Sequence, residues 1–398
     1  MTSTAAAQPA TLDRRSAIRF IVCLGLVSLF ADMTYEGAYS GIGPFLRDLG
    51  VTATAVGFIS GLGEMFAASL RYVSGRLADR THAYWTFVII GYTMNLLAIP
   101  ALAFVTTWQM AALLVVLERT GKAMRGPARD VLLSEATAVV GHGWGFGLHA
   151  VMDQTGAVIG PLIVAAVVAR EHNFGPAFLQ LGGPAALALA AIFLARYFRP
   201  NKGTPPKPKG NQVLPRVYWT YVIASAILAV GFLDFPLLSL HFENAQFFSK
   251  ETIPLLYSAA MAVVGLTALI CGRLFDRYGI PVLAFGVLAT MLALPLGFLG
   301  GKIGAVIAVM CWAAGHGVQD ATLRSGIAQV VSMNKRGTAF GAFNGVFGVA
   351  WFFGSWTMGA LYDVSLIALV VFGMVFQTTA AIVFLTLRKP LAEAAEAA

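Results

Sequence analysis

Long apolar stretches recur along the chain and constrain its fold more than any other feature. A helix that crosses a membrane needs about 20 mainly apolar residues. Of the 398 residues, 58% are hydrophobic and 12% are charged, and this charged share is about half that of an average soluble protein. The sequence predicts twelve spans, at about residues 17–45, 52–74, 84–105, 108–134, 144–168, 176–196, 217–241, 252–273, 280–300, 304–330, 339–361 and 365–387.

Basic residues gather on one side of these spans. With the N-terminus inside, most lysines and arginines outside the spans fall in cytoplasmic segments, and few, such as Arg47 and Lys250, fall outside. Cytoplasmic loops of membrane proteins collect Lys and Arg, so this bias accounts for the net charge of +8 without a nucleic-acid partner. The N-terminal apolar stretch lacks a signal cleavage site. We therefore expect a multi-pass protein of the cell membrane, here a bacterial inner membrane, with both termini cytoplasmic.

One connection is longer than the others. The segment 197–216 is rich in proline and lysine and has no apolar periodicity, which is typical of a solvated linker. It divides the spans into six and six. The predicted organisation is a cytoplasmic tail, a six-helix bundle, a cytoplasmic linker, a second six-helix bundle and a second cytoplasmic tail, at residues 1–15, 16–196, 197–216, 217–388 and 389–398.

The two halves share sequence, which is the signature of an internal repeat. After the second span the chain reads Gly75-Arg-Leu-Ala-Asp79-Arg80, and after the eighth it reads Gly272-Arg-Leu-Phe-Asp276-Arg277. Other matches follow in the same order. They are Phe30-Ala31-Asp32 with Phe232-Leu233-Asp234, Phe146-Gly147 with Phe340-Gly341, and Gly160 with Gly354.

Six plus six spans, a basic central loop and this repeated loop motif resemble the major facilitator superfamily. Two shorter signals are also similar to that family. Arg119 lies in the middle of the fourth span, and Gly156-Ala-Val-Ile-Gly160-Pro161 resembles a motif of the antiporter branch. A glycine pair at this spacing also fits ordinary helix packing.

The resemblance implies an all-α membrane protein, a monomer, with two pseudo-symmetric six-helix bundles around a central cavity. The bundles rock so that the cavity opens alternately to each side. The loop motifs would form a cytoplasmic gate, through Gly75, Asp79 and Arg80 in one half and Gly272, Asp276 and Arg277 in the other.

Many charges lie inside the predicted spans. Each would cost about 2.5–3.5 kcal/mol at a helix centre, and all of them facing lipid would cost on the order of 40 kcal/mol. They must therefore face water, pair with one another or lie near the interface. The acids are Asp32, Glu36, Glu64, Glu118, Asp130, Asp153, Asp234 and Asp320, and the bases are Arg71, Arg119, Lys122, Arg125, Arg129 and Arg324.

Asp32 and Glu36 of the first span are four residues apart and share a helix face. Two neighbouring carboxylates repel each other, and this repulsion raises the pKa of one of them, so that the pair tends to keep one proton. A proton or cation site is one interpretation, and pairing with bases of the fourth span is the other. Asp234 occupies the matching place in the second half.

Arg119, Lys122 and Arg125 lie within about one and a half turns of the fourth span. This group could bind an anionic substrate, or it could neutralise acids of neighbouring spans. Two further pairs, His149 with Asp153 and His316 with Asp320, could relay protons. One histidine and one carboxylate are only half a metal site, and we predict no metal centre. Trp144, Tyr35, Tyr39 and Trp351 could line a pocket.

The sequence contains no phosphate-binding G-x4-G-K-[ST] loop, no H-E-x-x-H and no G-x-S-x-G. We therefore expect neither an enzyme nor a cofactor. The predicted function is a secondary transporter, a proton-coupled antiporter that exports a small organic compound. Its partners would be that substrate, protons and the lipid bilayer. The alternatives are an uptake carrier or uniporter for an organic anion, a metal transporter and a non-transporting membrane sensor.

Overall fold

The computed structural model describes residues 13–198, 214–331, 336–388 and 390. Most of the predicted linker 197–216 and of the tails 1–15 and 389–398 therefore lies outside the described residues. Within them, all regular structure is helical. The first half contains α1 (Arg14–Asp48), α2 (Ala53–Thr81), α3 (Tyr84–Ala101), the short 3-10 turn η1 (Leu102–Phe104), α4 (Trp108–Val140), α5 (His142–Glu171), α6 (Phe174–Gln180) and α7 (Gly182–Tyr197). The second half contains α8 (Arg216–Val230), α9 (Phe235–Asn244), α10 (Thr252–Tyr278), α11 (Ile280–Leu299), α12 (Gly301–Val330), α13 (Arg336–Val364) and α14 (Leu366–Thr386).

These helices account for the twelve predicted spans. Among the described residues, 10 helical segments are long and apolar enough to cross a membrane. The other two spans are α4, which carries the charged side chains of the fourth span, and α13, which is rich in glycine and tryptophan.

Two spans expected to be continuous are broken. The span predicted at 217–241 is interrupted between Val230 and Phe235, and that at 176–196 at Leu181. In the first break, Trp312 Nε1 donates to the carbonyl of Leu233 at 2.8 Å, and Gln377 Nε2 donates to that of Gly231 at 3.0 Å. Side chains of neighbouring helices thus satisfy backbone groups that the broken helix leaves free, as burial in a membrane requires.

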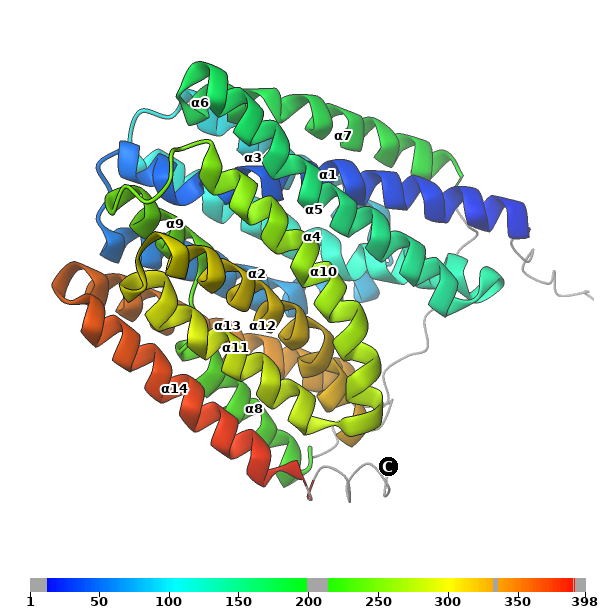
Figure 1. The fold of residues 1–398 in the computed structure, drawn as a ribbon. Coiled ribbons are helices and arrows are strands. Elements are labelled where there is room, and N and C mark those ends of the chain that lie inside the picture. The colour runs from blue at the N-terminus through cyan, green and yellow to red at the C-terminus, as the bar shows by residue number, and fades with distance from the viewer. Residues whose placement is uncertain (1–12, 199–213, 332–335, 389, 391–398) are drawn as a thin grey trace, which may run out of the picture.

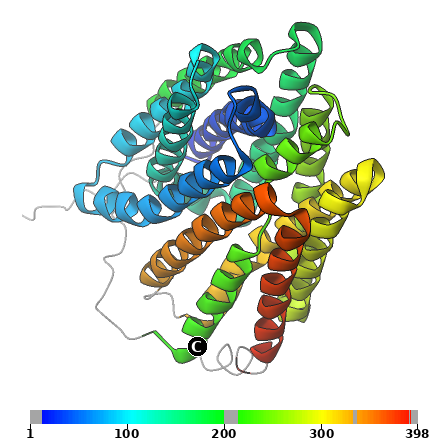
Figure 2. The ribbon, with the colours of Figure 1, turned by 90° about the vertical axis from the view of Figure 1, so that its left-hand side faces the viewer.

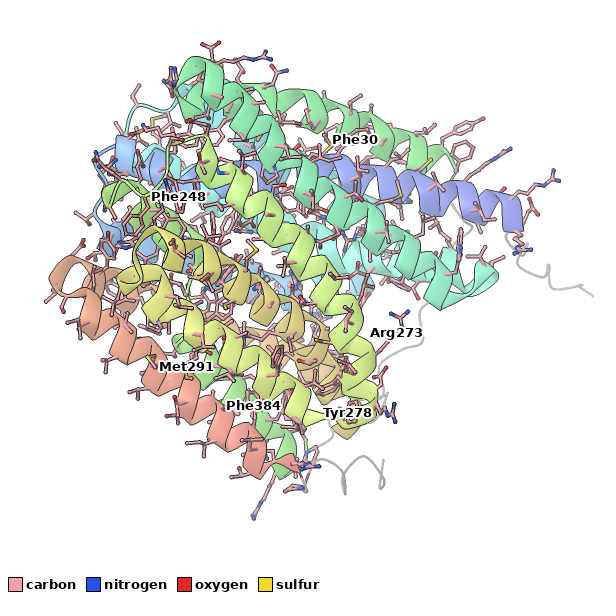
Figure 3. All side chains as sticks on the ribbon, in the orientation of Figure 1. Phe30, Phe248, Arg273, Tyr278, Met291 and Phe384 are labelled. Atoms are coloured by element: carbon pink, nitrogen blue, oxygen red, sulfur yellow. The ribbon has the colours of Figure 1, made fainter. Side chains whose placement is uncertain are left out.

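The helices form two groups, which correspond to the two halves of the chain. Figure 1 shows α1, α3, α5, α6 and α7 together in one group and α8 and α10–α14 in the other. Figure 2 shows α2 and α13 running side by side where the groups meet. We call the end where α1 begins and α14 ends the terminal end, and the opposite end, where α1 passes into α2, the far end. Figure 3 places Arg273 and Tyr278 at the terminal end of α10 and Phe248 towards the far end.

Glycines let the helices approach closely, and the same contacts recur in both halves. Gly91 of α3 meets the backbone of Gly121 in α4, and Gly286 of α11 likewise meets Gly315 of α12. A methyl group at any of these positions would collide with the facing helix. Between helices in a membrane, close packing of small residues replaces the hydrophobic effect as the source of stability.

One pair of glycines matched in the sequence, Gly160 and Gly354, also makes equivalent contacts. Gly160 of α5 lies against the Met33 carbonyl of α1, and Gly354 of α13 lies against the Val230 carbonyl of α8. The predicted fold, two pseudo-symmetric six-helix bundles, is confirmed.

Candidate functional site

Asp32 and Asp153 form a carboxyl pair inside the first bundle. Gly156, one turn beyond Asp153 on α5, packs against the backbone of Leu29 and the Cβ of Asp32, which brings the two helices together. The carboxyl groups of Asp32 and Asp153 are thereby neighbours that interact electrostatically. Since two neighbouring negative charges repel each other, this arrangement favours a proton on one of the two groups.

Asp32 is buried and Asp153 is half-buried, and one oxygen of each carboxyl group has no hydrogen-bond partner in the described residues. Asp32 is only 3% exposed. Asp32 Oδ2 and Asp153 Oδ1 are buried and accept no hydrogen bond from a donor in the described residues. The sequence suggested Glu36 as the neighbouring carboxyl group of Asp32, but the structure brings Asp153 to it from another helix.

Glu36 has different neighbours. Its Oε1 lies 3.5 Å from Lys122 Nζ, and its Oε2 accepts a 2.6 Å hydrogen bond from the hydroxyl group of Tyr257. Lys122 belongs to α4 of the first bundle, and Tyr257 to α10 of the second. Glu36 therefore joins the charged groups of the first bundle to the second bundle.

The basic residues of α4 also have partners. Arg119 lies 3.3 Å from both Glu64 and Glu118 and stacks over Tyr39 with 4.9 Å to the ring centre. Lys122 lies 4.0 Å above the centre of Tyr35. These contacts support the interpretation that Arg119 and Lys122 neutralise neighbouring acids.

Arg125 differs from these two bases. It is 2% exposed and lies over Tyr92 at 4.2 Å and over Tyr35 at 5.4 Å. Its Nε has no hydrogen-bond partner, and no carboxylate forms a salt bridge with it in the described residues. The ring faces of the two tyrosines are the contacts that accommodate its charge.

Asp234 lies in the break between α8 and α9 and faces neutral donors. Its Oδ1 accepts a 2.8 Å hydrogen bond from Trp351 Nε1, and its Oδ2 accepts one from the Ser355 hydroxyl group. Both donors belong to α13. Asp234 is 3% exposed, and no salt bridge is formed to it in the described chain.

Aromatic rings surround this part of the second bundle. The ring of Phe232 lies 4.8 Å from that of Trp351 and 5.6 Å from that of His316. His316 stacks on Trp312 at 5.2 Å, and Phe347 lies 5.5 Å from Trp351. Trp351 thus lies among aromatic rings beside Asp234, whereas Trp144 is 52% exposed.

The two histidine–aspartate pairs differ. His316 Nε2 lies 3.5 Å from Asp320 Oδ2, so the expected i,i+4 contact forms. The hydrogen-bond partner of His149 is instead Ser28 of α1, at 3.1 Å. No group of three or more potential metal ligands of the His, Cys, Asp and Glu types occurs in the described part of the chain.

The residues of the expected gate lie at the terminal end. Gly75 packs against Pro127 of α4, and Asp79 accepts a 3.0 Å hydrogen bond from the Tyr84 hydroxyl group. Arg80 is exposed. In the second half, Gly272 lies near Ala321, and the exposed Asp276 and Arg277 end α10, with Arg277 over the neighbouring Tyr278. Asp79 thus contacts its own bundle. Pro161, the last residue of the antiporter-like motif, lies inside α5 without ending it.

Contacts at the far end, which the sequence analysis missed, join the two bundles. Asp363, near the end of α13, accepts hydrogen bonds from the backbone amides of Ala53 and Thr54, at 3.3 and 2.9 Å, and from the Thr54 hydroxyl group at 2.6 Å. It caps the N-terminus of α2, where a negative charge is favourable. The sequence did contain a signal for this contact. Asp363 is an acid near the end of a predicted span, as Asp79 is near the end of α2.

Salt bridges reinforce this contact. Lys250 lies 2.6 Å from Asp48, and Arg47 lies 3.0 Å from Glu243. In the described residues, these are the ion pairs that link one bundle to the other, and both lie at the far end. A pocket of about 810 Å³ adjoins them, lined by residues that include Lys302, Phe247 and Phe248.

The family of the chain is shown by its match to a known protein family. Residues 24–355 match the Major Facilitator Superfamily. The chain belongs to the major facilitator superfamily. As a member, it is a multi-pass membrane protein and a secondary transporter of a small molecule.

Several related proteins match this superfamily member at different levels of sequence identity. It is 40% identical over 392 residues to an uncharacterized protein of Mycobacterium tuberculosis, with 96% of each chain covered. It is 22% identical to an uncharacterized MFS-type transporter of Methanocaldococcus jannaschii, covering 88% of this chain and 90% of that protein. A shorter match, 29% identical over 184 residues and 45% of each chain, is to the multidrug resistance protein MdtH of Photorhabdus laumondii.

Solved structures share the fold at low sequence identity. A mutant of the nucleoside transporter NupG superposes with a TM-score of 0.74 at 16% identity, covering 93% of this chain and 100% of that one. A bacterial homologue of the human lysosomal transporter Spinster, in an inward-facing conformation, superposes with a TM-score of 0.68 at 14% identity, covering 94% and 99%. These likenesses show the fold alone.

Proposed function

We propose that this transporter is a proton-coupled antiporter that exports a small organic compound. The carboxyl pair of Asp32 and Asp153 carries the proposal. An antiporter needs a group that holds a proton in one state and releases it in another. Two neighbouring carboxyl groups held together by the close packing of α1 and α5 are suited to this, because a shared proton removes the repulsion between them.

Glu36 links that pair to the surface between the bundles. It follows Asp32 by one turn of α1 and accepts a hydrogen bond from Tyr257 of the other bundle. A compound that enters between the bundles would compete for Glu36 or for Lys122 beside it. The resulting change in charge, one turn from Asp32, would alter the proton affinity of the carboxyl pair. Substrate and proton would then bind in alternation.

The far-end contacts support alternating access. With the basic side of the chain in the cytoplasm, the terminal end faces inward and the far end faces outward. The cap of Asp363 on α2 and the two inter-bundle ion pairs would hold the outer side closed. Release outward would require these contacts to break. Asp79 and Arg80 would engage the opposite bundle when the inner side closes.

The anion-carrier alternative has less support. It needs basic side chains with free charge facing the substrate. Lys122 is paired with Glu36, and Arg125 is enclosed by Tyr35 and Tyr92. The metal-transporter and sensor alternatives have no cluster or contact that favours them over proton antiport.

Proton release from acidified inside-out vesicles, read with a pH-sensitive dye, tests the proposal. A panel of cationic, neutral and anionic compounds is added in turn to vesicles that contain the full chain. We expect at least one compound to collapse the proton gradient, because it enters the vesicle in exchange for protons. Asp32→Asn should abolish that response.

Glu171→Gln is the control, because Glu171 is an exposed acid at the end of α5 and belongs neither to the carboxyl pair nor to the predicted proton relays. It should keep the response. An Asp32→Asn protein that releases protons at the wild-type rate would contradict the antiport mechanism. If no compound releases protons from vesicles that contain folded protein, the proposal also fails.

A further inference from the structure

The charged side chains between the bundles do not balance. We define the inter-bundle charge cluster as Glu36, Glu64, Glu118, Arg119, Lys122 and Asp234. Arg119 forms salt bridges with two carboxylates, Glu64 and Glu118, and Lys122 forms one with Glu36. Asp234 receives only neutral donors, Trp351 and Ser355. With all groups ionised, the cluster carries two negative charges more than positive ones, and only one more when Arg125, which lies over the same Tyr35 ring as Lys122, is counted with it.

Packing brings the unbalanced acids from the two bundles together. Gly61 of α2, one turn before Glu64, packs against Phe352 and Ser355 of α13. Ser355 is the residue that donates to Asp234. Glu64 and Arg119 are accordingly among the charged groups that act on Asp234 across the interface. The Glu64 side chain is 32% exposed, whereas those of Arg119 and Glu118 are 10% and 6% exposed, so Glu64 is the acid that a ligand can reach.

Aromatic side chains lie next to the acids that carry the excess negative charge. We define the aromatic wall as Phe232, Trp312, His316, Phe347 and Trp351. Phe347, Trp351 and His316 are only half-buried, whereas Phe232 and Trp312 are buried behind them. Arginines and lysines of α4 already lie over Tyr35, Tyr39 and Tyr92 of the first bundle. In the described residues, no lysine or arginine lies over Trp351 or Phe347.

We propose that the transported compound is an organic cation. Its charge is balanced by Glu64 and Asp234, and its apolar or planar part packs on the aromatic wall. This inference rests on the proposed function, because it takes the surface between the bundles as the substrate site. A cation gains both from the surplus negative charge and from the ring faces. An anion of the same shape would meet repulsion from the surplus carboxylates.

Direct binding tests the substrate class without proton coupling. Purified full-length protein in detergent is titrated by calorimetry with (2-naphthylmethyl)trimethylammonium and with 2-naphthylmethanesulfonate, which have the same ring and opposite charges. Tetraphenylphosphonium and ethidium extend the set of cations. We expect at least one cation to bind, and the naphthyl sulfonate to bind about tenfold more weakly than its ammonium counterpart, or not at all.

Variants at three positions locate the site. Glu64→Gln and Asp234→Asn should each weaken cation binding about tenfold or more. Trp351→Leu should also weaken it, and Trp351→Phe should restore part of the loss, because phenylalanine keeps a ring face. Glu171→Gln is the control, since Glu171 is an exposed acid outside the inter-bundle charge cluster and the aromatic wall, and its binding should stay within twofold of the wild type. Asp234→Asn keeps a hydrogen-bonding side chain, so it is informative even if Glu64→Gln disturbs Arg119.

The outcomes separate this inference from the proposed function. If no cation binds, if the sulfonate binds as tightly as the ammonium compound, or if Glu64→Gln and Asp234→Asn leave cation affinity unchanged, the substrate class is wrong. Proton release driven only by neutral or anionic compounds would also overturn it, while leaving antiport intact. Charge-selective binding that depends on Glu64 and Asp234, without proton release in vesicles, would support the cation and reject antiport.

Discussion

The two six-helix bundles share their packing contacts but differ in the side chains between their helices. Gly91 with Gly121 in one bundle and Gly286 with Gly315 in the other let equivalent helices meet backbone to backbone. The first bundle, however, encloses salt bridges and a carboxyl pair, whereas the inner face of the second has Asp234 among aromatic rings. Packing is common to both bundles, and the chemistry that we propose for proton and substrate binding is divided between them.

This division suggests different tasks for the two bundles. In the first, bases and acids of α1, α2, α4 and α5 respond together to a change in charge. In the second, rings and one carboxylate provide a surface for an apolar cation. Variants in matched positions can break or sharpen this comparison, and the four below are ordered from the largest expected effect to the smallest.

The first prediction concerns the carboxyl pair. Asp32→Asn and Asp153→Asn should each reduce substrate-driven proton release to the background of vesicles without the protein, because either change removes the shared proton site. The double variant should be no worse than either single one, since residues that act as a unit are not additive. Vesicle dye assays measure all three. Additive partial losses would show that the two carboxyl groups act separately.

The second prediction concerns the salt bridges of the first bundle. Arg119→Gln leaves Glu64 and Glu118 without their cation, and breaking a buried ion pair by removing one partner costs about 3–5 kcal/mol. The thermal unfolding midpoint in detergent should therefore fall clearly. Arg324→Gln, an exposed arginine of the second bundle, should change it little. Equal midpoints for the two variants would contradict the difference between the bundles.

The third prediction tests what the bundles share. Gly160→Val and Gly354→Val place a side chain against the backbone of α1 or α8, and such overpacking typically costs about 1–3 kcal/mol. The two variants should lower the unfolding midpoint by similar amounts. Gly147→Ala and Gly345→Ala, where a methyl group meets nothing within 4 Å, serve as controls on the same two helices. If the unfolding midpoint fell strongly in only one of the two valine variants, the two glycine contacts would not be equivalent.

The fourth prediction concerns the far end, where the bundles meet. Asp363→Asn removes the charge that caps α2, and an anion at a helix N-terminus contributes about 0.3–1 kcal/mol. The far end should therefore open a few times more often. In a background without native cysteines, Ser239→Cys, which lies against Gly43 of α1, should react correspondingly faster with a membrane-impermeant maleimide.

Glu171→Gln provides the comparison, because Glu171 is an exposed acid at the end of α5 and has no part in the cap. Its reaction rate should equal that of the parent protein. Unchanged labelling in the Asp363→Asn protein would show that the cap does not hold the far end closed.

Much of the fold could be predicted from the sequence. The length of the apolar stretches, the linker and the repeated loop motif predicted two six-helix bundles, because a helix must satisfy its backbone within the membrane and twenty apolar residues span it. The break at Gly231 to Asp234 had a local signal that the sequence analysis did not use, because Gly231 follows the last residue of α8 and Asp234 precedes a proline in the first turn of α9, which is a pattern of helix end and helix start. The side chains of Trp312 and Gln377, far away in sequence, make that break possible.

The sequence predicted which residues belong to the candidate site, but it did not predict which of them contact one another. The cost of a charge in a membrane identified Asp32, Arg119, Asp153 and Asp234 from the sequence alone. Helical spacing paired Asp32 with Glu36 and His149 with Asp153, because only neighbours on one helix are visible in a sequence. The structure instead pairs Asp32 with Asp153 and His149 with Ser28, across the close contact of α1 and α5.

The sequence by itself determined that this chain spans a membrane in two related halves and that its buried charges need partners. Only the tertiary structure decided which charges meet, that Asp234 accepts hydrogen bonds from neutral donors, and that Asp363 caps a helix of the other bundle. The reason is physical. Hydrophobicity and helix formation act within each segment, whereas ion pairs, caps and ring contacts depend on helices that pack together from distant parts of the chain.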